Sequence, residues 1–258
     1  MLVVLSPAKT LDYESPLPTD RYTEPAFLED SQELIEVLRG YSREDLRGLM
    51  DISEDLAQLN AERYESFSRP FTPENARQAI LAFDGDVYRD FRFSEYNDDH
   101  FAFLQDHVRI LSGLYGLLRP LDLMQPYRLE MGTRLSTKRG KNLYEFWGTK
   151  ITEAVNGALD AQGDEVLLNL ASNEYFKAVK KKELKGRFLD VKFLDLKNGE
   201  YKAISFFLKR LRGTLTDYMV RHQIQDPERL KEFNEQGYYF SEERSTEEEY
   251  VFLRDEKP

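Results

Sequence analysis

Ionisable side chains follow several short apolar runs of this 258-residue chain, at the points where buried strands are expected to end. Lys9 follows the run 2–5, and Glu174 follows the run 166–170. Loops at strand ends commonly carry functional side chains, and amines, carboxylates and phenols in one cleft can carry out acid–base chemistry on a small molecule. Eight residues are candidates for such a cleft: Lys9, Asp86, Tyr88, Tyr127, Arg128, Glu130, Glu174 and Lys209.

The carboxylates of this set have a simpler explanation, because Asp86, Glu130 and Glu174 could form internal salt bridges with Lys9 and Arg128. A cleft that binds a small molecule requires more, since the eight side chains must then converge in one pocket. Two alternatives therefore stay open: an enzyme of unknown reaction that acts on a small molecule, and a set of structural ion pairs.

The segment from Arg109 to Pro120 contains a second candidate site. A predicted amphipathic helix over about 100–112 leads into Gly113-Leu114-Tyr115-Gly116, and another short apolar segment follows. This order is typical of a helix-hairpin-helix, whose glycines let a DNA phosphate approach the backbone N–H groups at the start of the second helix. The alternative is a glycine C-cap followed by a packed turn.

Basic residues are concentrated in two blocks of an otherwise acidic chain. The net charge is −11, yet residues 177–212 carry a net charge of +8 and residues 109–150 one of +5. A helix predicted over about 172–181, if it continued, would place Lys177, Lys181 and Lys185 on one face, because they are four residues apart. The alternative is that the two basic blocks are only solvent-exposed faces of the protein. The residues predicted to contact DNA are Gly113, Tyr115, Gly116, Arg119, Arg128, Arg134, Lys138, Arg139, Lys177, Lys180, Lys181, Lys182, Lys209, Arg210 and Arg212.

Composition excludes several classes of protein. The chain has no cysteine, so it has no disulfide, thiolate nucleophile or cysteine-bound metal. Its three histidines lack metal-ligand spacing, and neither the dinucleotide-binding glycine motif nor a serine-hydrolase elbow occurs. We therefore predict no metal and no cofactor. The longest apolar runs have four or five residues, far short of the roughly 20 of a membrane-spanning helix. Without a recognisable signal peptide, a cytoplasmic protein with no membrane contact is expected.

The pattern of apolar residues and turns predicts a single mixed α/β (α+β) domain over residues 1–258, with a mixed sheet flanked by helices. The strongest local signal is Asn198-Gly199 between the alternating runs 187–196 and 200–205, which predicts a type I′ β-hairpin. Other strands are predicted at 2–5, 79–83, 166–170, 238–240 and 250–252. Helices are predicted to begin at Asp30, Ser42, Ser53, Thr72 and Asp226, and to span about 146–160 and 206–222.

The stretch from Leu111 to Gly132 resembles the YaaA family of bacterial peroxide-stress proteins. The resemblance extends to Leu5–Asp12, Gly85–Tyr88, Asn142–Gly148, Asn169–Lys177 and Ile204–Gly213, so it covers essentially the whole chain. It implies a family-specific fold with a helix-hairpin-helix element and a basic cleft. It also implies sequence-independent binding of duplex and branched DNA, and protection from oxidative DNA damage together with a lowering of free iron. We therefore expect a DNA-binding protein, and keep the small-molecule enzyme as the alternative.

Overall fold

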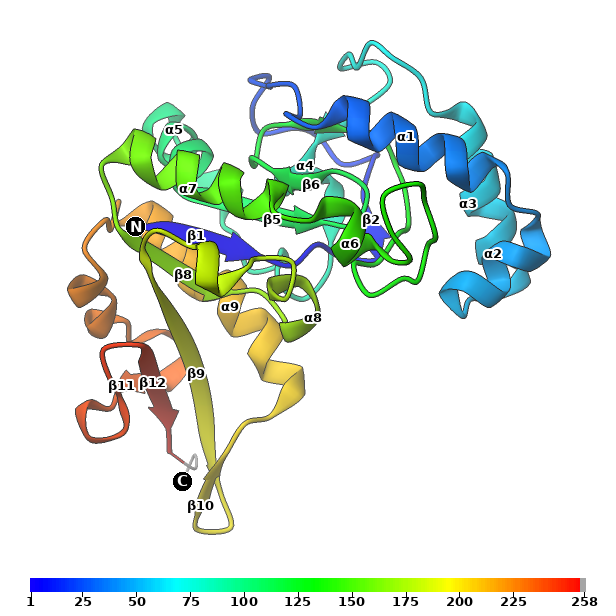
Figure 1. Ribbon diagram of the computed structural model, residues 1–258. Coiled ribbons are helices and arrows are strands. Elements are labelled where there is room, and N and C mark those ends of the chain that lie inside the picture. Colours follow the sequence, from blue (N-terminus) through cyan, green and yellow to red (C-terminus); the bar gives the residue numbers. More distant parts are fainter. Residues whose placement is uncertain (256–258) are drawn as a thin grey trace.

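A mixed sheet forms the centre of the protein (Figure 1). The computed structural model describes residues 1–255, except the side chains of Ser205 and Phe206. The sheet has eight strands in the order β11-β12-β9-β8-β1-β5-β6, and β10 pairs with β9. Its strands are β1 (Leu2–Leu5), β5 (Val108–Ser112), β6 (Gly116–Leu118), β8 (Val166–Leu170), β9 (Arg187–Lys197), β10 (Glu200–Lys202), β11 (Tyr239–Phe240) and β12 (Glu249–Arg254). Two short pairs lie outside it: β2 (Thr10–Leu11) with β4 (Phe83–Asp84), and β3 (Arg77–Gln78) with β7 (Leu123–Met124).

The middle of the sheet is parallel. Strand β1 pairs in parallel with β5 on one side and with β8 on the other, and β8, β9 and β12 continue in parallel. The pairs β5–β6, β9–β10 and β11–β12 are antiparallel. Every residue of β1 and β8 is buried, because a parallel strand in the middle of a sheet is covered on both faces and is therefore almost uniformly apolar. The predicted mixed sheet is thus confirmed.

Helices cover both faces of this sheet, with α7 and α9 on opposite faces and α1 to α3 at the end of the molecule far from the β9–β10 hairpin (Figure 1). The helices are α1 (Leu28–Arg39), α2 (Arg43–Met50), α3 (Glu54–Ser66), α4 (Ala79–Ala82), α5 (Asp98–His107), α6 (Leu143–Trp147), α7 (Lys150–Gln162), α8 (Asn173–Phe176) and α9 (Ser205–Arg221). Short 3-10 segments occur at Phe93–Glu95, Lys181–Glu183, Pro227–Glu232, Glu235–Gly237 and Glu242–Arg244. Within residues 1–255, no helix has the length and apolar character needed to cross a membrane.

Elements with a strong local signal form where they were predicted. Asn198 and Gly199 have φ values of 55° and 77°, as a type I′ turn requires, and they join β9 to β10. Helix α2 begins after Ser42, whose side chain accepts a hydrogen bond from the Asp45 N–H while the Asp45 carboxylate accepts one from the Ser42 N–H. This reciprocal capping box fixes the start of the helix.

Four predicted elements are wrong or shorter than expected. No helix begins at Thr72, where the chain makes a turn, and the predicted strand 79–83 is the short helix α4 followed by β4. The helix predicted after Asp226 is only a 3-10 segment. The helix predicted over 172–181 ends at Phe176, and a second 3-10 segment begins at Lys181. The lysines from Lys177 to Lys185 therefore share no helix face.

The predicted helix-hairpin-helix is also wrong, because the chain forms a β-hairpin there. Helix α5 ends at His107, and residues 108–112 form a strand that pairs with both β1 and β6. A Cβ on Gly113 would lie 2.2 Å from the Leu129 carbonyl oxygen, and one on Gly116 would lie 2.7 Å from the Trp147 ring. Tyr115 between them is completely buried. The two glycines thus permit internal packing and present no backbone to a DNA phosphate.

We expect acid to destabilise the fold through His107 at the end of α5. This side chain is buried, and its Nδ1 lies 2.9 Å from the Met1 carbonyl oxygen. Burial lowers the pKa of His107 below its usual value of 6.5, so the unfolded chain binds a proton more readily than the folded chain. The contribution of neutral His107 to the free energy of unfolding is complete above about pH 6.5 and is lost as the pH falls below this value. Urea unfolding between pH 7.5 and 5.5 should show this loss, and a His107→Gln variant should show a smaller one. An unchanged pH dependence in the variant would contradict the assignment.

Candidate functional site

A cavity of about 500 Å³ opens at the carboxyl ends of β1 and β8. Ser6 directly follows β1, and Ser172 follows β8 after one intervening residue. In sheets of this kind the chain leaves neighbouring strands in opposite directions, and the crevice at their carboxyl ends is the usual ligand site. The cavity is lined by Ser6, Pro7, Ala8, Lys9, Thr10, Asp84, Gly85, Asp86, Val87, Arg89, Glu130, Ser172, Glu174, Tyr175, Lys209 and Arg212.

Hydrogen bonds hold the two strand-end loops together at the floor of this cavity. The Ser172 N–H donates to Ser6 Oγ at 2.8 Å, and Ser6 Oγ lies 3.3 Å from Ser172 Oγ. The Tyr88 hydroxyl donates to the Ser6 carbonyl at 2.7 Å and is itself buried. Tyr88 thus acts as a support of the loop, rather than as a side chain that faces the cavity, whose lining does not include it.

Two glycines bring three distant segments of the chain into contact around the cavity. A Cβ on Gly85 would lie 2.8 Å from Ala8 Cβ, and a Cβ on Gly213 of α9 would lie 1.8 Å from the Val87 carbonyl oxygen. Real Cβ atoms do not approach other atoms this closely, so only glycine allows the loop 84–88 to lie between the segment around Ala8 and helix α9. These contacts place Lys9, Asp86 and Lys209 at one cavity.

Several charged groups of the cavity already have partners. Lys9 Nζ lies 2.9 Å from Glu130 Oε1, and an Arg128 terminal nitrogen lies 3.3 Å from the same oxygen. The guanidinium of Arg89 binds Asp84 at 3.0 Å. Because these three ion pairs stand at the edge of the cavity and are partly exposed, each contributes little to stability but orients its side chains.

Glu174 and Tyr175 approach the cavity from the start of α8. One carboxylate oxygen of Glu174 accepts a hydrogen bond from the Gly132 N–H at 2.9 Å. Burial raises the pKa of Tyr175 far above its usual value of 10, so its hydroxyl stays protonated. Next to the cavity, Arg128 has a buried Nε for which residues 1–255 provide no hydrogen-bond partner. A buried donor of this kind is uncommon in folded proteins and normally meets water or a ligand.

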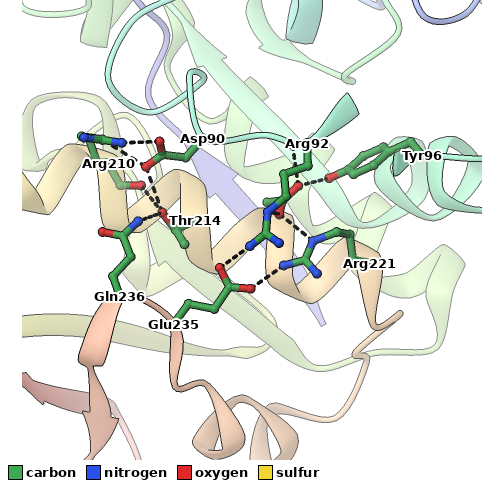
Figure 2. A network of polar contacts seen from close by, with 9 residues as sticks. Asp90, Arg92, Tyr96, Arg210, Thr214, Arg221, Glu235 and Gln236 are labelled. Carbon is green, nitrogen blue, oxygen red and sulfur yellow. Dashed lines mark hydrogen bonds and ion pairs between the residues drawn. The ribbon is translucent and has the colours of Figure 1, made fainter. Parts of the chain in front are cut away.

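Four charged groups that line the cavity have no ion pair within the described part of the chain: Asp86, Glu174, Lys209 and Arg212. Lys209 and Arg212 are one turn apart on α9. Arg212 is half-buried, and this burial lowers the pKa of its guanidinium although the charge of Asp190 opposes the effect. A desolvated cation without a counter-ion is costly unless an anion joins it. Arg210 on the same helix is different, since it binds Asp90 (Figure 2).

Seven of the eight residues predicted for a small-molecule cleft therefore gather in one place. Five of them line the cavity, and Tyr127 and Arg128 line a small recess that shares Lys9 and Glu130 with it. The Tyr127 hydroxyl lies 2.6 Å from Ser112 Oγ at the end of β5. The salt-bridge alternative holds for the Lys9–Glu130–Arg128 group but not for Asp86 or Glu174. Sequence reasoning missed Arg89, Ser172 and Tyr175, although the position of Ser172 just after an apolar strand was a usable signal.

Comparison with known proteins places the chain in a family. Residues 1–244 match the family model described as "Peroxide stress protein YaaA". The chain belongs to the YaaA family. It is also similar to a UPF0246 protein of Alteromonas mediterranea (strain DSM 17117), with 56% identity over 257 residues that cover 100% of this chain and 99% of the relative. A role in the response to oxidative stress fits this membership.

The residues predicted to contact DNA in this YaaA-family chain fall into three groups. Gly113, Tyr115 and Gly116 are buried. Four arginines are held in ion pairs: Arg119 with Asp122, Arg128 with Glu130, Arg139 with Asp30 and Arg210 with Asp90. The other eight form no ion pair with any residue that the structure describes: Arg134, Lys138, Lys177, Lys180, Lys181, Lys182, Lys209 and Arg212. Of these eight, the last two belong to the cavity.

The other six cations lie outside the cavity lining, in the segments 134–138 and 177–182, and we name them the cationic rim: Arg134, Lys138, Lys177, Lys180, Lys181 and Lys182. Lys177 Nζ lies 4.8 Å from the centre of the Tyr144 ring, and the Tyr144 hydroxyl donates to the Glu174 carbonyl. Lys181 Nζ lies 3.7 Å from the centre of the Phe188 ring. The aromatic rings thus hold two of the lysines in place while leaving their charges uncompensated.

Proposed function

We propose that this protein limits DNA damage during peroxide stress by binding DNA without sequence preference, through the cationic rim. The observation that supports this proposal is the difference in pairing between the two sets of cations. Arg119, Arg139 and Arg210 are neutralised by carboxylates, whereas the rim residues form no ion pair with a described residue. Cations without counter-ions are the ones that gain by meeting phosphates.

The overall charge sets the strength that we expect of this binding. The chain carries a net charge of −11, so much of its surface is expected to repel a polyanion, whereas the rim should attract one. Contacts to phosphates position a protein without reading bases. The proposed binding is accordingly moderate in affinity, sensitive to salt and similar for duplex and branched DNA.

The proposal assigns protection to the contact with DNA rather than to iron storage. Iron bound as a cargo would need several nitrogen or oxygen ligands close together. Within residues 1–255, no three histidine, aspartate or glutamate side chains are grouped closely enough to hold a metal ion. A lowering of free iron in the cell would then follow from a partner or a reaction, and iron measured in the purified protein should remain far below one atom per chain.

The test compares DNA binding of two double variants over a range of salt concentrations. Lys180→Glu/Lys182→Glu reverses two charges of the rim and leaves Lys181 on its ring. We expect its slope of log affinity against log salt on duplex DNA to be shallower by about 1.8, since each phosphate contact contributes about 0.9. Fluorescence anisotropy with duplex, bubble and four-way-junction DNA measures this slope.

The matched control is Lys197→Glu/Lys202→Glu on the β9–β10 hairpin, which changes the net charge by the same amount at a distance from the rim. Its slope should stay within experimental error of the wild type. Equal slopes for the two double variants, or no binding by the wild type at physiological salt, would disprove the proposal.

A further inference from the structure

We propose that the cavity at the ends of β1 and β8 binds a small phosphate monoester that also carries hydroxyl groups, of the size of a sugar phosphate or a nucleoside monophosphate. This inference goes beyond the DNA contact of the cationic rim and does not depend on it. The cavity of about 500 Å³ lies within the range of volumes that proteins use for small ligands.

The cations of the cavity indicate the charge of the ligand. Lys209 and Arg212 lie one turn apart on α9 and form no ion pair with a described residue. Two such charges match a phosphate monoester, which carries a charge of about −1.5 to −2 at neutral pH. The planar guanidinium of Arg212 can bind two phosphate oxygens at once. Its partial burial makes an unpaired state costly, and the charge of Asp190 offsets this cost only in part, so a bound dianion would relieve the remainder.

The acidic side chains of the same cavity indicate what else the ligand carries. Asp86 is half-buried without a hydrogen bond or ion pair to any described residue, and Glu174 uses one oxygen for the Gly132 N–H. Carboxylates accept hydrogen bonds from sugar hydroxyls, as they do in nucleotide-binding folds. They would repel a ligand that is anionic along its whole length. A phosphate at one end and hydroxyls elsewhere satisfy both sets of groups.

This balance of charges also separates the cavity from the DNA surface. Its lining contains four basic residues, Lys9, Arg89, Lys209 and Arg212, and four acidic ones, Asp84, Asp86, Glu130 and Glu174. A DNA backbone, with a charge on every nucleotide, would meet as many repulsive as attractive groups. A compact ligand with one charged end can place that end at the two cations alone.

Isothermal titration calorimetry with four probes tests the ligand class. Ribose 5-phosphate and adenosine 5′-monophosphate should bind, whereas ribose and inorganic phosphate should bind at least tenfold more weakly than ribose 5-phosphate. Malate serves as the carboxylate probe. Equal affinities for ribose 5-phosphate and inorganic phosphate, or tighter binding of malate than of ribose 5-phosphate, would overturn the assignment. Failure of both ribose 5-phosphate and adenosine 5′-monophosphate to bind would also overturn it.

Variants locate the site within the protein. Arg212→Gln and Lys209→Gln should each weaken ribose 5-phosphate binding by about tenfold or more, because each removes a charge-assisted hydrogen bond. Lys209 is exposed, so its replacement keeps the test valid if Arg212→Gln fails to fold. Arg229→Gln, at an exposed arginine outside the cavity lining, is the matched control and should leave the affinity unchanged. Unchanged affinity in both Lys209→Gln and a folded Arg212→Gln would overturn the site.

Two further measurements separate this inference from the proposed function. Asp86→Asn should weaken the binding of ribose 5-phosphate and leave that of inorganic phosphate unchanged or stronger, because the amide is a weaker acceptor for sugar hydroxyls and no longer repels the phosphate. Lys180→Glu/Lys182→Glu should retain ribose 5-phosphate binding even though it loses affinity for DNA. Loss of ribose 5-phosphate binding in this double variant would show that rim and cavity are one site, and would overturn the inference without affecting the DNA proposal.

Discussion

Replacing Asp217 by alanine is expected to lower the free energy of unfolding by about 3–5 kcal/mol. Asp217 on α9 has a completely buried side chain. Its Oδ1 accepts hydrogen bonds from the Arg92 N–H at 2.9 Å and from the Tyr96 hydroxyl at 3.0 Å, and its Oδ2 accepts one from Arg221 Nε at 2.7 Å. Arg92 and Arg221 both also bind Glu235 (Figure 2). Without Asp217 a buried donor and a largely buried guanidinium lose their acceptor, and this loss accounts for the large expected effect.

Urea unfolding of three variants measures this effect. Asp217→Asn keeps the shape of the side chain and some of its hydrogen bonds. Its free energy of unfolding should therefore lie between those of the wild type and Asp217→Ala. The control is Asp160→Ala, which breaks an exposed ion pair with Lys185 and should cost less than about 1 kcal/mol. If Asp217→Ala and Asp160→Ala were equally stable, the network would not hold α9 to the 90–96 loop.

The sequence alone was sufficient for elements whose signals are local. The run Leu2–Leu5 and the Asn198-Gly199 turn are each determined by a few neighbouring residues, and each forms as predicted. Ser42 and Asp45 similarly fix the start of α2 through contacts three residues apart. Signals of this range are visible in the chain without knowledge of the fold.

Residues 108–112 show why other elements could not be predicted. Their apolar residues continue the pattern of α5 without a proline or glycine to end it, so a single long helix was the natural expectation. The strand forms because it pairs with β1, from which it is separated by about a hundred residues. Pairing at such a distance outweighs local helix preference, and nothing near residue 108 reports it.

The candidate site was predicted in part for the same reason. Lys9 and Glu174 follow apolar strands, and because the carboxyl ends of parallel strands meet at one edge, their convergence was foreseeable. The ion pairs of the arginines could not be foreseen. Arg139 is neutralised by Asp30 and Arg210 by Asp90, each more than a hundred residues away. Charge counted along the chain therefore overestimated the basic surface available to DNA.

Gly213→Ala is expected to destabilise the protein by about 3 kcal/mol and to abolish ribose 5-phosphate binding together. The added Cβ would lie 1.8 Å from the Val87 carbonyl oxygen and 2.8 Å from its carbon. Both are backbone atoms, so relief requires α9 and the 84–88 loop to separate, at the cost typical of overpacking. Asp86 precedes Val87, and Lys209 and Arg212 lie on α9, so the same separation pulls apart the groups proposed to hold the ligand.

Gly157→Ala on α7 is the matched control, because a Cβ there would meet no atom within 4 Å. Since alanine is favoured over glycine inside a helix, this variant should gain about 0.5–1 kcal/mol and should retain ligand binding. Urea unfolding and calorimetry on both variants give the comparison. The two variants should change the free energy of unfolding in opposite directions. The same substitution stabilises α7, where the added Cβ meets no atom, and destabilises the protein at α9, where it meets the Val87 backbone. A Gly213→Ala protein as stable as Gly157→Ala would mean that the 84–88 loop can move away from α9 freely, and that the cavity is not a fixed site.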